Sequence, residues 1–317
     1  MKVIHTNKQL SHEPKKFLVA GSFETHPEKP ERARILLNAA KEFGLTSEQP
    51  EDYGINYITE IHTERYIHYL QNIYKRWDRK KNTSDEVTPG IHPVRSDCCF
   101  PDSAECHIGF HHSYLSRPIG PDTWESAYWS AQSAIHAAKL ISKGEQSTYA
   151  LCRPPGHHAA KDYAAGFCYL GNTAIAAQTL KEKFNKIAVL DVDVHHGNGT
   201  EDILKEREGI EFFSIHQHPA YPGTGTKSLK NCHNYTVRPD LPREDYRKIA
   251  KKAIADLINY EPDIIIVSAG FDSRRDDLLG CFEVTDDAFR RMTRTAMDLA
   301  DEIAGGRLVS LLEGGYN

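Results

Sequence analysis

Long hydrophobic runs are missing from the 317-residue sequence, which has no stretch of about 18 apolar residues that could cross a membrane. The first residues likewise lack the apolar core of a secretory signal peptide. Excess positive charge is also missing, because 39 lysines and arginines stand against 44 aspartates and glutamates, for a net charge of −5. These absences predict a chain that does not enter membranes and does not bind nucleic acid nonspecifically. A local negative funnel could still attract a cationic ligand.

Cysteine pairs of the CxxC type are absent among the seven cysteines. An odd count without such pairs argues against a disulfide framework and against a four-cysteine zinc site, and it favours the reducing cytoplasm as the location. The 17 histidines carry more information, since several of them lie in clusters with carboxylates.

Short apolar runs alternate with amphipathic stretches along most of the chain. Residues 187–190 and 264–268 are almost wholly apolar, as strands covered on both faces should be. The alternation predicts an α/β fold with one mostly parallel sheet and helices on both of its faces. The expected strands are residues 2–5, 57–61, 148–152, 186–193, 211–216, 263–269 and 307–312. The expected helices are residues 30–43, 64–77, 123–143, 171–184, 200–208, 243–259 and 286–304.

Residues 80–121 interrupt this rhythm, being rich in Pro, Gly, Asp, Cys and His and without a clear period. A loop of this length in a compact domain is usually a lid, a binding loop or an oligomer contact. We interpret it as an insertion into one domain and not as a linker between two.

Polar clusters follow four of the expected strands directly, at residues 153–158, 191–199, 269–272 and 313–316. In open parallel sheets, ligands bind beyond the carboxyl ends of the strands. Four strand ends that each carry polar residues therefore predict one shared site.

The second cluster has the pattern of a metal site. Asp191, Asp193 and His195 alternate, so an extended backbone would turn all three side chains to the same side. Alternating polar residues also occur on exposed strands, but this strand is otherwise apolar, and burying three ionisable groups without a partner is costly. Zinc or iron suits such mixed donors. A catalytic zinc site needs three ligands and an open position, which makes Asp272 the natural third ligand beside Asp193 and His195; its alternative role is a helix N-cap.

Two further groups suggest catalysis. His157 and His158 follow a Pro-Pro-Gly turn that stiffens the backbone and end an expected core strand, which predicts a general acid or base role instead of an inert surface pair. Tyr316 follows two glycines, and its hydroxyl could donate a hydrogen bond to a developing oxyanion. Taken alone, it would more simply be a packed aromatic residue.

Six motifs then stand in a characteristic order. They are RPPGHHA at 153–159, GFCY at 166–169, DVDVHHGNGT at 191–200, YPGTG at 221–225, SAGFD at 268–272 and EGGY at 313–316, and PEKPERA at 27–33 precedes them. This set resembles the zinc-dependent histone deacetylase and acetylpolyamine amidohydrolase superfamily, most of all the bacterial acetylpolyamine amidohydrolases. The resemblance implies the three-layer arginase/deacetylase α/β fold, as a single deacetylase domain over residues 1–317.

The resemblance also implies roles for individual residues. Asp193, His195 and Asp272 would bind one zinc ion, or ferrous iron instead. His158 would be the general base, with His157 as its electrostatic or acid partner, and Tyr316 would polarise the acetyl carbonyl. The remaining implied roles are Asp191 and Asn198 as partners of the two histidines, Gly166, Phe167, Tyr221 and Leu279 along a narrow tunnel, and Asp191, Asp193, His195 and Ser214 around a structural potassium ion.

The substrate implied by the resemblance is a small cationic acetylated amine, such as an acetylated putrescine or cadaverine, hydrolysed to acetate and the free amine. Glu24 and Glu105 are candidates for attracting its ammonium groups, although both could be ordinary solvated charges. The 80–121 insertion fits a homodimer that narrows the tunnel and excludes folded proteins. Leu279 stands where some polyamine-selective members have Glu and resembles class II protein deacetylases, so acetyl-lysine in proteins remains the alternative substrate.

Two different functions are also compatible with parts of the sequence. A non-catalytic metal-binding scaffold would usually have lost His158 or Tyr316, and both are present. An arginase-type enzyme would need a second full set of metal-binding carboxylates, which is not evident. Family members continue into another helix after the Tyr316 motif, so the chain either is truncated after Asn317 or lacks that helix.

Overall fold

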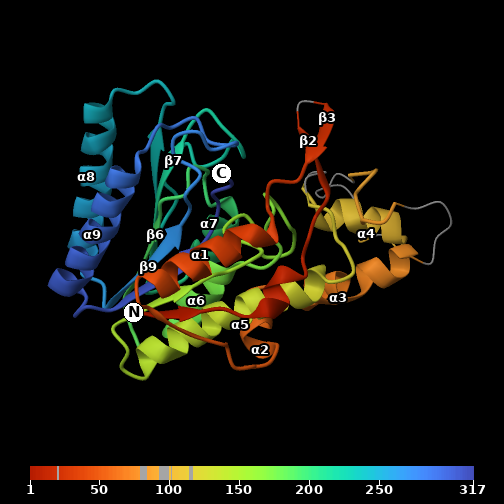
Figure 1. Ribbon diagram of the computed structural model, residues 1–317, viewed down its shortest axis with the longest axis horizontal. Coiled ribbons are helices and arrows are strands. Elements are labelled where there is room, and N and C mark those ends of the chain that lie inside the picture. Colours follow the sequence, from red (N-terminus) through yellow and green to blue (C-terminus); the bar gives the residue numbers. More distant parts are fainter. Residues whose placement is uncertain (20, 79–83, 93–99, 101, 114–116) are drawn as a thin grey trace.

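The computed structural model describes residues 1–19, 21–78, 84–92, 100, 102–113 and 117–317. Its centre is an eight-stranded sheet in the order β4-β1-β5-β10-β9-β6-β7-β8 (Figure 1). Each pairing in this sheet is parallel. The strands are β1 (Lys2–Ile4), β4 (Thr46–Glu48), β5 (Ser147–Ala150), β6 (Ile187–Asp191), β7 (Ile210–Gln217), β8 (Cys232–Val237), β9 (Ile264–Ala269) and β10 (Leu308–Leu312).

Helices cover both faces of the sheet, as the alternating pattern predicts. The cluster of buried residues on one face includes α3, α5 and α6, and the cluster on the other face includes α8 and α9 (Figure 1). The helices are α1 (Pro30–Glu42), α2 (Asn56–Thr59), α3 (Glu64–Asp78), α4 (Ala104–His111), α5 (Thr123–Ser142), α6 (Asn172–Leu180), α7 (Asn198–Leu204), α8 (Arg243–Tyr260) and α9 (Asp286–Ile303), with a 3-10 turn at Asn7–Leu10.

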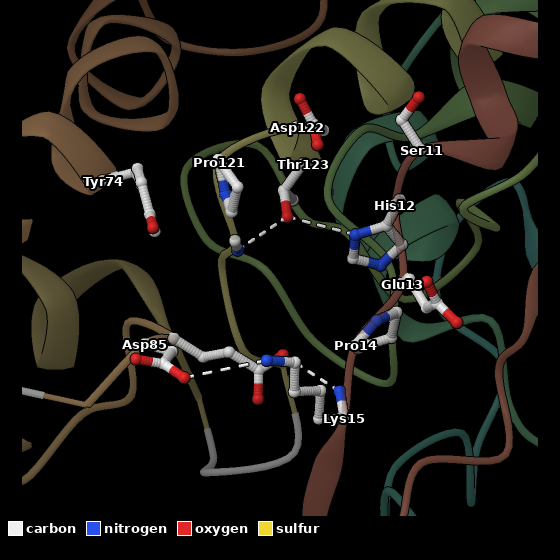
Figure 2. A pocket seen from close by; sticks show the side chains of 12 residues that line it. Ser11, His12, Glu13, Pro14, Lys15, Tyr74, Asp85, Pro121, Asp122 and Thr123 are labelled. Atoms are coloured by element: carbon white, nitrogen blue, oxygen red, sulfur yellow. Dashed lines mark hydrogen bonds and ion pairs between the residues drawn. The ribbon is translucent and has the colours of Figure 1, made fainter.

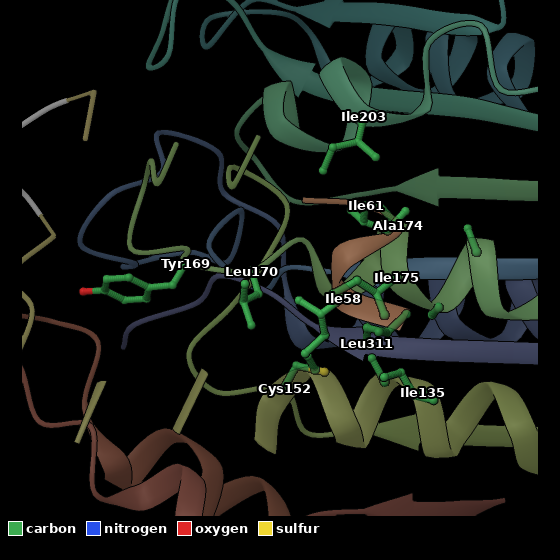
Figure 3. Close-up of a cluster of buried hydrophobic side chains, with 14 of the residues drawn as sticks. Ile58, Ile61, Ile135, Cys152, Tyr169, Leu170, Ala174, Ile175, Ile203 and Leu311 are labelled. Carbon is green, nitrogen blue, oxygen red and sulfur yellow. The ribbon is translucent and has the colours of Figure 1, made fainter. Parts of the chain in front are cut away.

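Strand β6 shows why its sequence is apolar throughout. All of its residues are buried, with Ile187 and Val189 in the core beneath α5 and α6 and Ala188 and Leu190 in the core beneath α8 and α9. Side chains alternate between the two faces of a strand, so a strand with helices on both sides needs apolar residues at consecutive positions. Figure 3 shows part of the first core, where helices and strands meet in one apolar cluster.

The strand expected at residues 57–61 is wrong, because this segment forms the short helix α2. Ile58 and Ile61 are both buried in the core of Figure 3. Residues three apart lie on the same face of a helix, so this spacing lets both side chains reach the core from one turn. A short apolar run does not distinguish a strand from a buried helical turn by periodicity alone.

The insertion at 80–121 contains structure that its composition does not predict. Helix α4 lies within it, begins at the N-cap Ser103 and buries Ile108 and Phe110. The described ends of the insertion are joined by a bridge between Val87 and Ile119. Residues 80–83, 93–99, 101 and 114–116 of the insertion lie outside the described residues.

Four further strands also escaped the sequence pattern. β4 and β8 are the edge strands of the large sheet, and β2 (Lys16–Val19) pairs antiparallel with β3 (Ser22–Thr25) in a hairpin that projects from the body (Figure 1). Edge strands and hairpins are partly exposed and polar, so they lack the apolar runs of the central strands. Among the described residues, no helix is both long and apolar enough to cross a bilayer.

Candidate metal centre and active site

The four strands whose ends carry the polar clusters are direct neighbours in the sheet. β5, β10, β9 and β6 lie side by side in its centre. Because all four are parallel, their carboxyl ends open on the same edge, and the clusters after them converge there. The predicted shared site at this edge is therefore consistent with the topology.

Three side chains at this edge form a group that could hold a metal ion. One donor atom each from Asp193, His195 and Asp272 lies within 4.8 Å of the others, and all three residues are buried. The Nδ1 of His195 is 3.1 Å from Oδ1 of Asp193 and 2.9 Å from Oδ2 of Asp272. Asp272 is thus not a helix N-cap, since its Oδ1 accepts from the backbone N–H of Val194 at 2.9 Å and its other oxygen faces His195.

The charges of this group fit a divalent cation. Burial and the Asp193 carboxylate raise the pKa of Asp272 to about 6. Burial alone would lower the pKa of His195, but the carboxylates of Asp272 and Asp193 raise it to about 10. Two buried carboxylates and an imidazole thus compete for protons in one place, and a divalent cation satisfies all three at once. The donor set of two oxygens and one nitrogen suits zinc or iron.

Backbone contacts hold the ligands in place. The remaining oxygen of Asp193, Oδ2, accepts from the N–H of Gly314 at 2.9 Å. A Cβ atom at Gly314 would come within 2.4 Å of Oδ2 of Asp272 and within 2.6 Å of Oδ2 of Asp193. Glycine is therefore required at this point of the EGGY motif, because its backbone must touch both carboxylates.

The tandem histidines lie beside this group and have different partners. Nδ1 of His157 is 3.1 Å from Oδ2 of Asp191, whereas Nδ1 of His158 is 2.7 Å from Oδ1 of Asn198. The two rings are 4.0 Å apart between centroids. An amide oxygen can only accept, so Asn198 fixes the His158 proton on Nδ1 and leaves Nε2 free as a base.

The surroundings of the two histidines separate their pKa values. Burial would lower the pKa of His157, but the carboxylates of Asp193 and Asp191 raise it well above its usual value. Burial and the positive charges of His157 and His195 lower the pKa of His158 well below its usual value. A pair of titratable groups pushed apart in this way suits an acid or cationic partner beside a neutral base.

Tyr316 follows β10 and is held by packing on both sides. Its ring meets the ring of Phe167 edge to face, with centroids 5.5 Å apart, and the guanidinium of Arg32 lies 4.6 Å from its centroid. Burial raises the pKa of the Tyr316 hydroxyl well above its usual value, which keeps this group protonated as a hydrogen-bond donor.

Aromatic and small residues surround the histidine pair. The ring of Tyr221 lies 5.1 Å from the ring of His158 and 5.9 Å from that of His195. Gly166 has a φ of +48°, and a Cβ atom there would lie 2.0 Å from Cδ2 of His158. This glycine therefore lets the loop that carries Phe167 pass directly against the proposed base.

The sequence pattern assigned no role to Glu313 and Arg32, although they lie within the motifs EGGY and PEKPERA, respectively. The fully buried Glu313 accepts at Oε2 from the N–H groups of Gly156 and His157, at 2.7 and 2.9 Å. Burial raises its pKa to about 7. Arg32 donates to the carbonyls of Glu313 and Gly315, at 2.6 and 2.5 Å. The only signal in the sequence was the occurrence of charged residues inside these motifs.

Other predicted residues lie farther out or in the sheet. Glu24 is exposed in β3, paired in register with Phe17, whose ring lies 5.8 Å from that of Phe167. Glu105 is exposed in the first turn of α4. Ser214 pairs in register with Asp191, and its Oγ is 2.9 Å from Nδ1 of His216.

A separate polar pocket of about 320 Å³ lies between the N-terminal segment and the insertion (Figure 2). It is lined by Ser11, His12, Glu13, Pro14, Lys15, Tyr74, Asp85, Glu86, Gly120, Pro121, Asp122 and Thr123. The N–H of Lys15 donates to Oε1 of Glu86 at 2.9 Å, and its ammonium pairs with Asp85 at 3.7 Å. None of the predicted catalytic residues lines this pocket.

Comparison with known proteins agrees with this geometry. Residues 26–317 match the family described as the histone deacetylase domain. The chain is 35% identical over 326 residues to an acetylpolyamine amidohydrolase of Burkholderia pseudomallei, covering 99% of this chain and 93% of that protein. It is 32% identical over 333 residues to an acetylpolyamine amidohydrolase of Mycoplana ramosa, covering 100% and 95%. A crystal structure of the acetylpolyamine aminohydrolase from Burkholderia pseudomallei matches with a TM-score of 0.91 at 34% identity, covering 100% of this chain and 94% of that one.

Proposed function

Because this chain belongs to the histone deacetylase family and is a hydrolase of the deacetylase type, we propose that it uses zinc to hydrolyse small acetylated amines of the putrescine and cadaverine type. The products are acetate and the free amine. One observation carries the proposal: Asp193, His195 and Asp272 cluster at the strand ends that also present His157 and His158.

The residues of the chain divide the chemistry among them. When bound, the divalent ion supplies Lewis-acid polarisation of the acetyl carbonyl and lowers the pKa of a water molecule. Nε2 of His158 takes the proton from the attacking water, while Asn198 holds the opposite side of the ring. The Tyr316 hydroxyl donates to the carbonyl oxygen as negative charge develops there.

The other histidine completes the reaction. His157, kept protonated by Asp191, stabilises the negative charge that accumulates nearby, and the histidine pair delivers a proton to the leaving amine. The rings of Phe167 and Tyr221 would flank the aliphatic part of the substrate, with Leu279 and Gly166 completing the walls.

The identity of the metal is part of the proposal. Zinc is our first choice and ferrous iron the alternative, because both suit two carboxylates and one imidazole. We further propose a structural potassium ion near Asp191, Asp193, His195 and Ser214. The pKa of Asp191 is raised by its burial, so a nearby cation would favour its charged form.

The choice of substrate rests on the relatives and on the insertion. Both relatives compared above carry the name acetylpolyamine amidohydrolase, and this chain covers them almost completely. A homodimer through residues 80–121 would narrow the entrance, and Glu24 and Glu105 would attract ammonium groups. Leu279 is compatible with the alternative, an acetyl-lysine protein deacetylase, since an apolar wall accepts a lysine side chain as well as a short diamine. The cytoplasmic location remains a prediction.

A side-by-side assay tests the proposal. The purified chain, loaded with zinc or with ferrous iron, is given N-acetylputrescine, N-acetylcadaverine and an acetyl-lysine peptide, and the released acetate is measured. We expect faster turnover of the two small amines, and His158→Gln as the matched control should be inactive on all three. Turnover of the peptide alone would replace the first choice by the alternative, and no turnover of any of them would refute the deacetylase proposal.

Dimerisation is tested separately. Light scattering compares the wild-type chain with a variant in which the insertion is shortened between its bridged positions Val87 and Ile119. We expect a dimer mass for the first and a monomer mass for the second. An unchanged dimer mass would place the interface elsewhere.

A further inference from the structure

One carboxylate joins two segments that border the site. Oδ2 of Asp277 accepts from the backbone N–H groups of Tyr316 at 2.7 Å and of Asn317 at 3.2 Å. Its other oxygen, Oδ1, accepts from the N–H of Leu279 at 3.0 Å. The contact with Leu279 is an ordinary local turn, two residues along the chain. The contacts with Tyr316 and Asn317 span 39 and 40 residues, so a local turn does not explain them.

The segment that donates the two long-range bonds has no regular secondary structure of its own. Residues 313–317 follow β10 outside any helix or strand. Gly314 and Gly315 precede the tyrosine, and Gly315 has a φ of +111°. Two consecutive glycines leave a backbone with large conformational freedom. The orientation of the Tyr316 ring must therefore come from contacts with other parts of the chain.

Phe167 packs on the Tyr316 ring, and Gly314 bonds to Asp193 and Phe271. Two groups of opposite charge hold the peptide groups next to the tyrosine. Arg32 donates to the carbonyls of Glu313 and Gly315, while Asp277 accepts from the N–H groups of Tyr316 and Asn317. Hydrogen bonds to charged partners are shorter and stronger than neutral ones. Together they hold the two peptide groups that flank Tyr316, and Arg32 also holds the carbonyl of Glu313, so the backbone that carries the ring is fixed.

We propose that Asp277 is a positioning residue that holds the Tyr316 hydroxyl at the reacting carbonyl and sets its separation from the wall residue Leu279. The kinetic part of this inference rests on the proposed function. Asp277 itself does not touch the substrate. Its effect on turnover passes through the placement of Tyr316, because a misplacement of about 1 Å can cost about 10²-fold in rate.

The neighbouring residue offers a matched control. Asp276 is exposed and has a φ of +67°, which asparagine tolerates well. Its backbone carbonyl, and not its side chain, accepts from Nδ2 of Asn317 at 2.7 Å. Asp276→Asn therefore removes one negative charge from the same loop but keeps the bonds of Asp277 to residues 316 and 317.

The kinetic test compares Asp277→Asn with Asp276→Asn on N-acetylputrescine. Asparagine keeps one acceptor oxygen and replaces the other with a donor, so it cannot accept from both segments. We expect kcat of Asp277→Asn to fall by about 10- to 10²-fold with KM within about threefold, and Asp276→Asn to keep both constants. Adding Asp277→Asn to Tyr316→Phe should cause little further loss, since the hydroxyl that Asp277 positions is then absent. Independent, multiplicative losses would overturn the proposal.

A second measurement does not depend on activity. Amide hydrogen exchange of the peptide containing residues 313–317, followed by mass spectrometry, should accelerate in Asp277→Asn and stay as in wild type in Asp276→Asn. Unchanged exchange in Asp277→Asn would refute the positioning role, whatever the activity of the variant. If the wild-type chain hydrolysed no acetylated amine, the proposed function would fail. The exchange experiment would still decide whether Asp277 holds residues 313–317 in place. Should Asp277→Asn not fold, Asp277→Ser carries both tests.

Discussion

The loop that carries Gly166 and Phe167 is tied at both ends to one buried histidine, and this predicts a specific loss of stability in acid. Nε2 of His62 accepts from the N–H of Gly171 at 2.9 Å, and its Nδ1 donates to the carbonyl of Ala160 at 3.0 Å. The ring is therefore neutral, and a second proton would break the bond to Gly171. Burial lowers the pKa of His62 from its ordinary value of 6.5 to about 4.

The size and sign of the effect follow from these two values. Between about pH 6.5 and 4 the unfolded chain binds a proton at His62 and the folded chain does not. Stability is therefore complete above about pH 6.5, is lost as the pH falls through this window, and changes no further below about pH 4. The total loss from this group is about 3 kcal/mol, because each unit of pKa difference is worth about 1.4 kcal/mol.

Urea unfolding at half-unit steps from pH 7.5 to 4.5 measures the effect. His62→Gln should lower stability at neutral pH, yet it should lose less on acidification than wild type, with a slope smaller by up to about 1.4 kcal/mol per pH unit. His68→Gln is the matched control, since His68 is exposed on the neighbouring helix α3 and its loss should leave the slope unchanged. Parallel curves for wild type and His62→Gln would show that His62 is not held neutral by its two partners.

Three further predictions concern the site itself. Tyr316→Phe should lower kcat by about 10²- to 10³-fold, the effect of losing one oxyanion donor, while the ring keeps its contacts with Phe167 and Arg32; near-normal turnover would remove Tyr316 from the reaction. Glu313→Ala should lower the free energy of unfolding by about 2–6 kcal/mol because two buried N–H groups lose their acceptor, and Glu313→Gln, which keeps a carbonyl oxygen, should lose less; equal urea midpoints for the two variants would contradict this. Chelation of the metal should abolish turnover and lower the thermal midpoint. The free energy of unfolding should fall by about 4 kcal/mol if the free metal concentration had been about a thousandfold above its Kd. A chelated sample with unchanged melting and activity would refute a bound ion.

Some of the fold was predictable because its cause is local. The apolar, β-branched run at 187–190 favours a strand covered on both sides, and β6 is one. The helices at 243–259 and 286–304 follow from their amphipathic spacing, and α8 and α9 match them within a residue or two. The strand prediction at residues 57–61 was wrong because a short segment with apolar side chains at 58 and 61 fits a strand or a buried helical turn equally well.

The site was predictable where its chemistry lies within a single motif. Asp193 and His195 stand two apart directly after β6, in a bend and not on the extended strand that their alternation predicts, and Asp272 follows a wholly buried strand. The proposal of these three as ligands therefore rested on strand ends that meet, and the positions at strand ends are visible in the order of residues.

The residues that hold the site together were not predictable in this way. Glu313 reaches Gly156 across 157 positions, and Asp277 reaches Tyr316 across 39, so each pairing depends on how β5, β9 and β10 lie beside one another. The pKa values of His157 and His158 likewise depend on folded surroundings: the carboxylates of Asp193 and Asp191 raise the first, whereas burial and the charges of His157 and His195 lower the second. Residue order was enough to propose the reacting groups because their types are intrinsic to the chemistry, whereas packing alone selected their distant partners because those contacts exist only once the chain has folded.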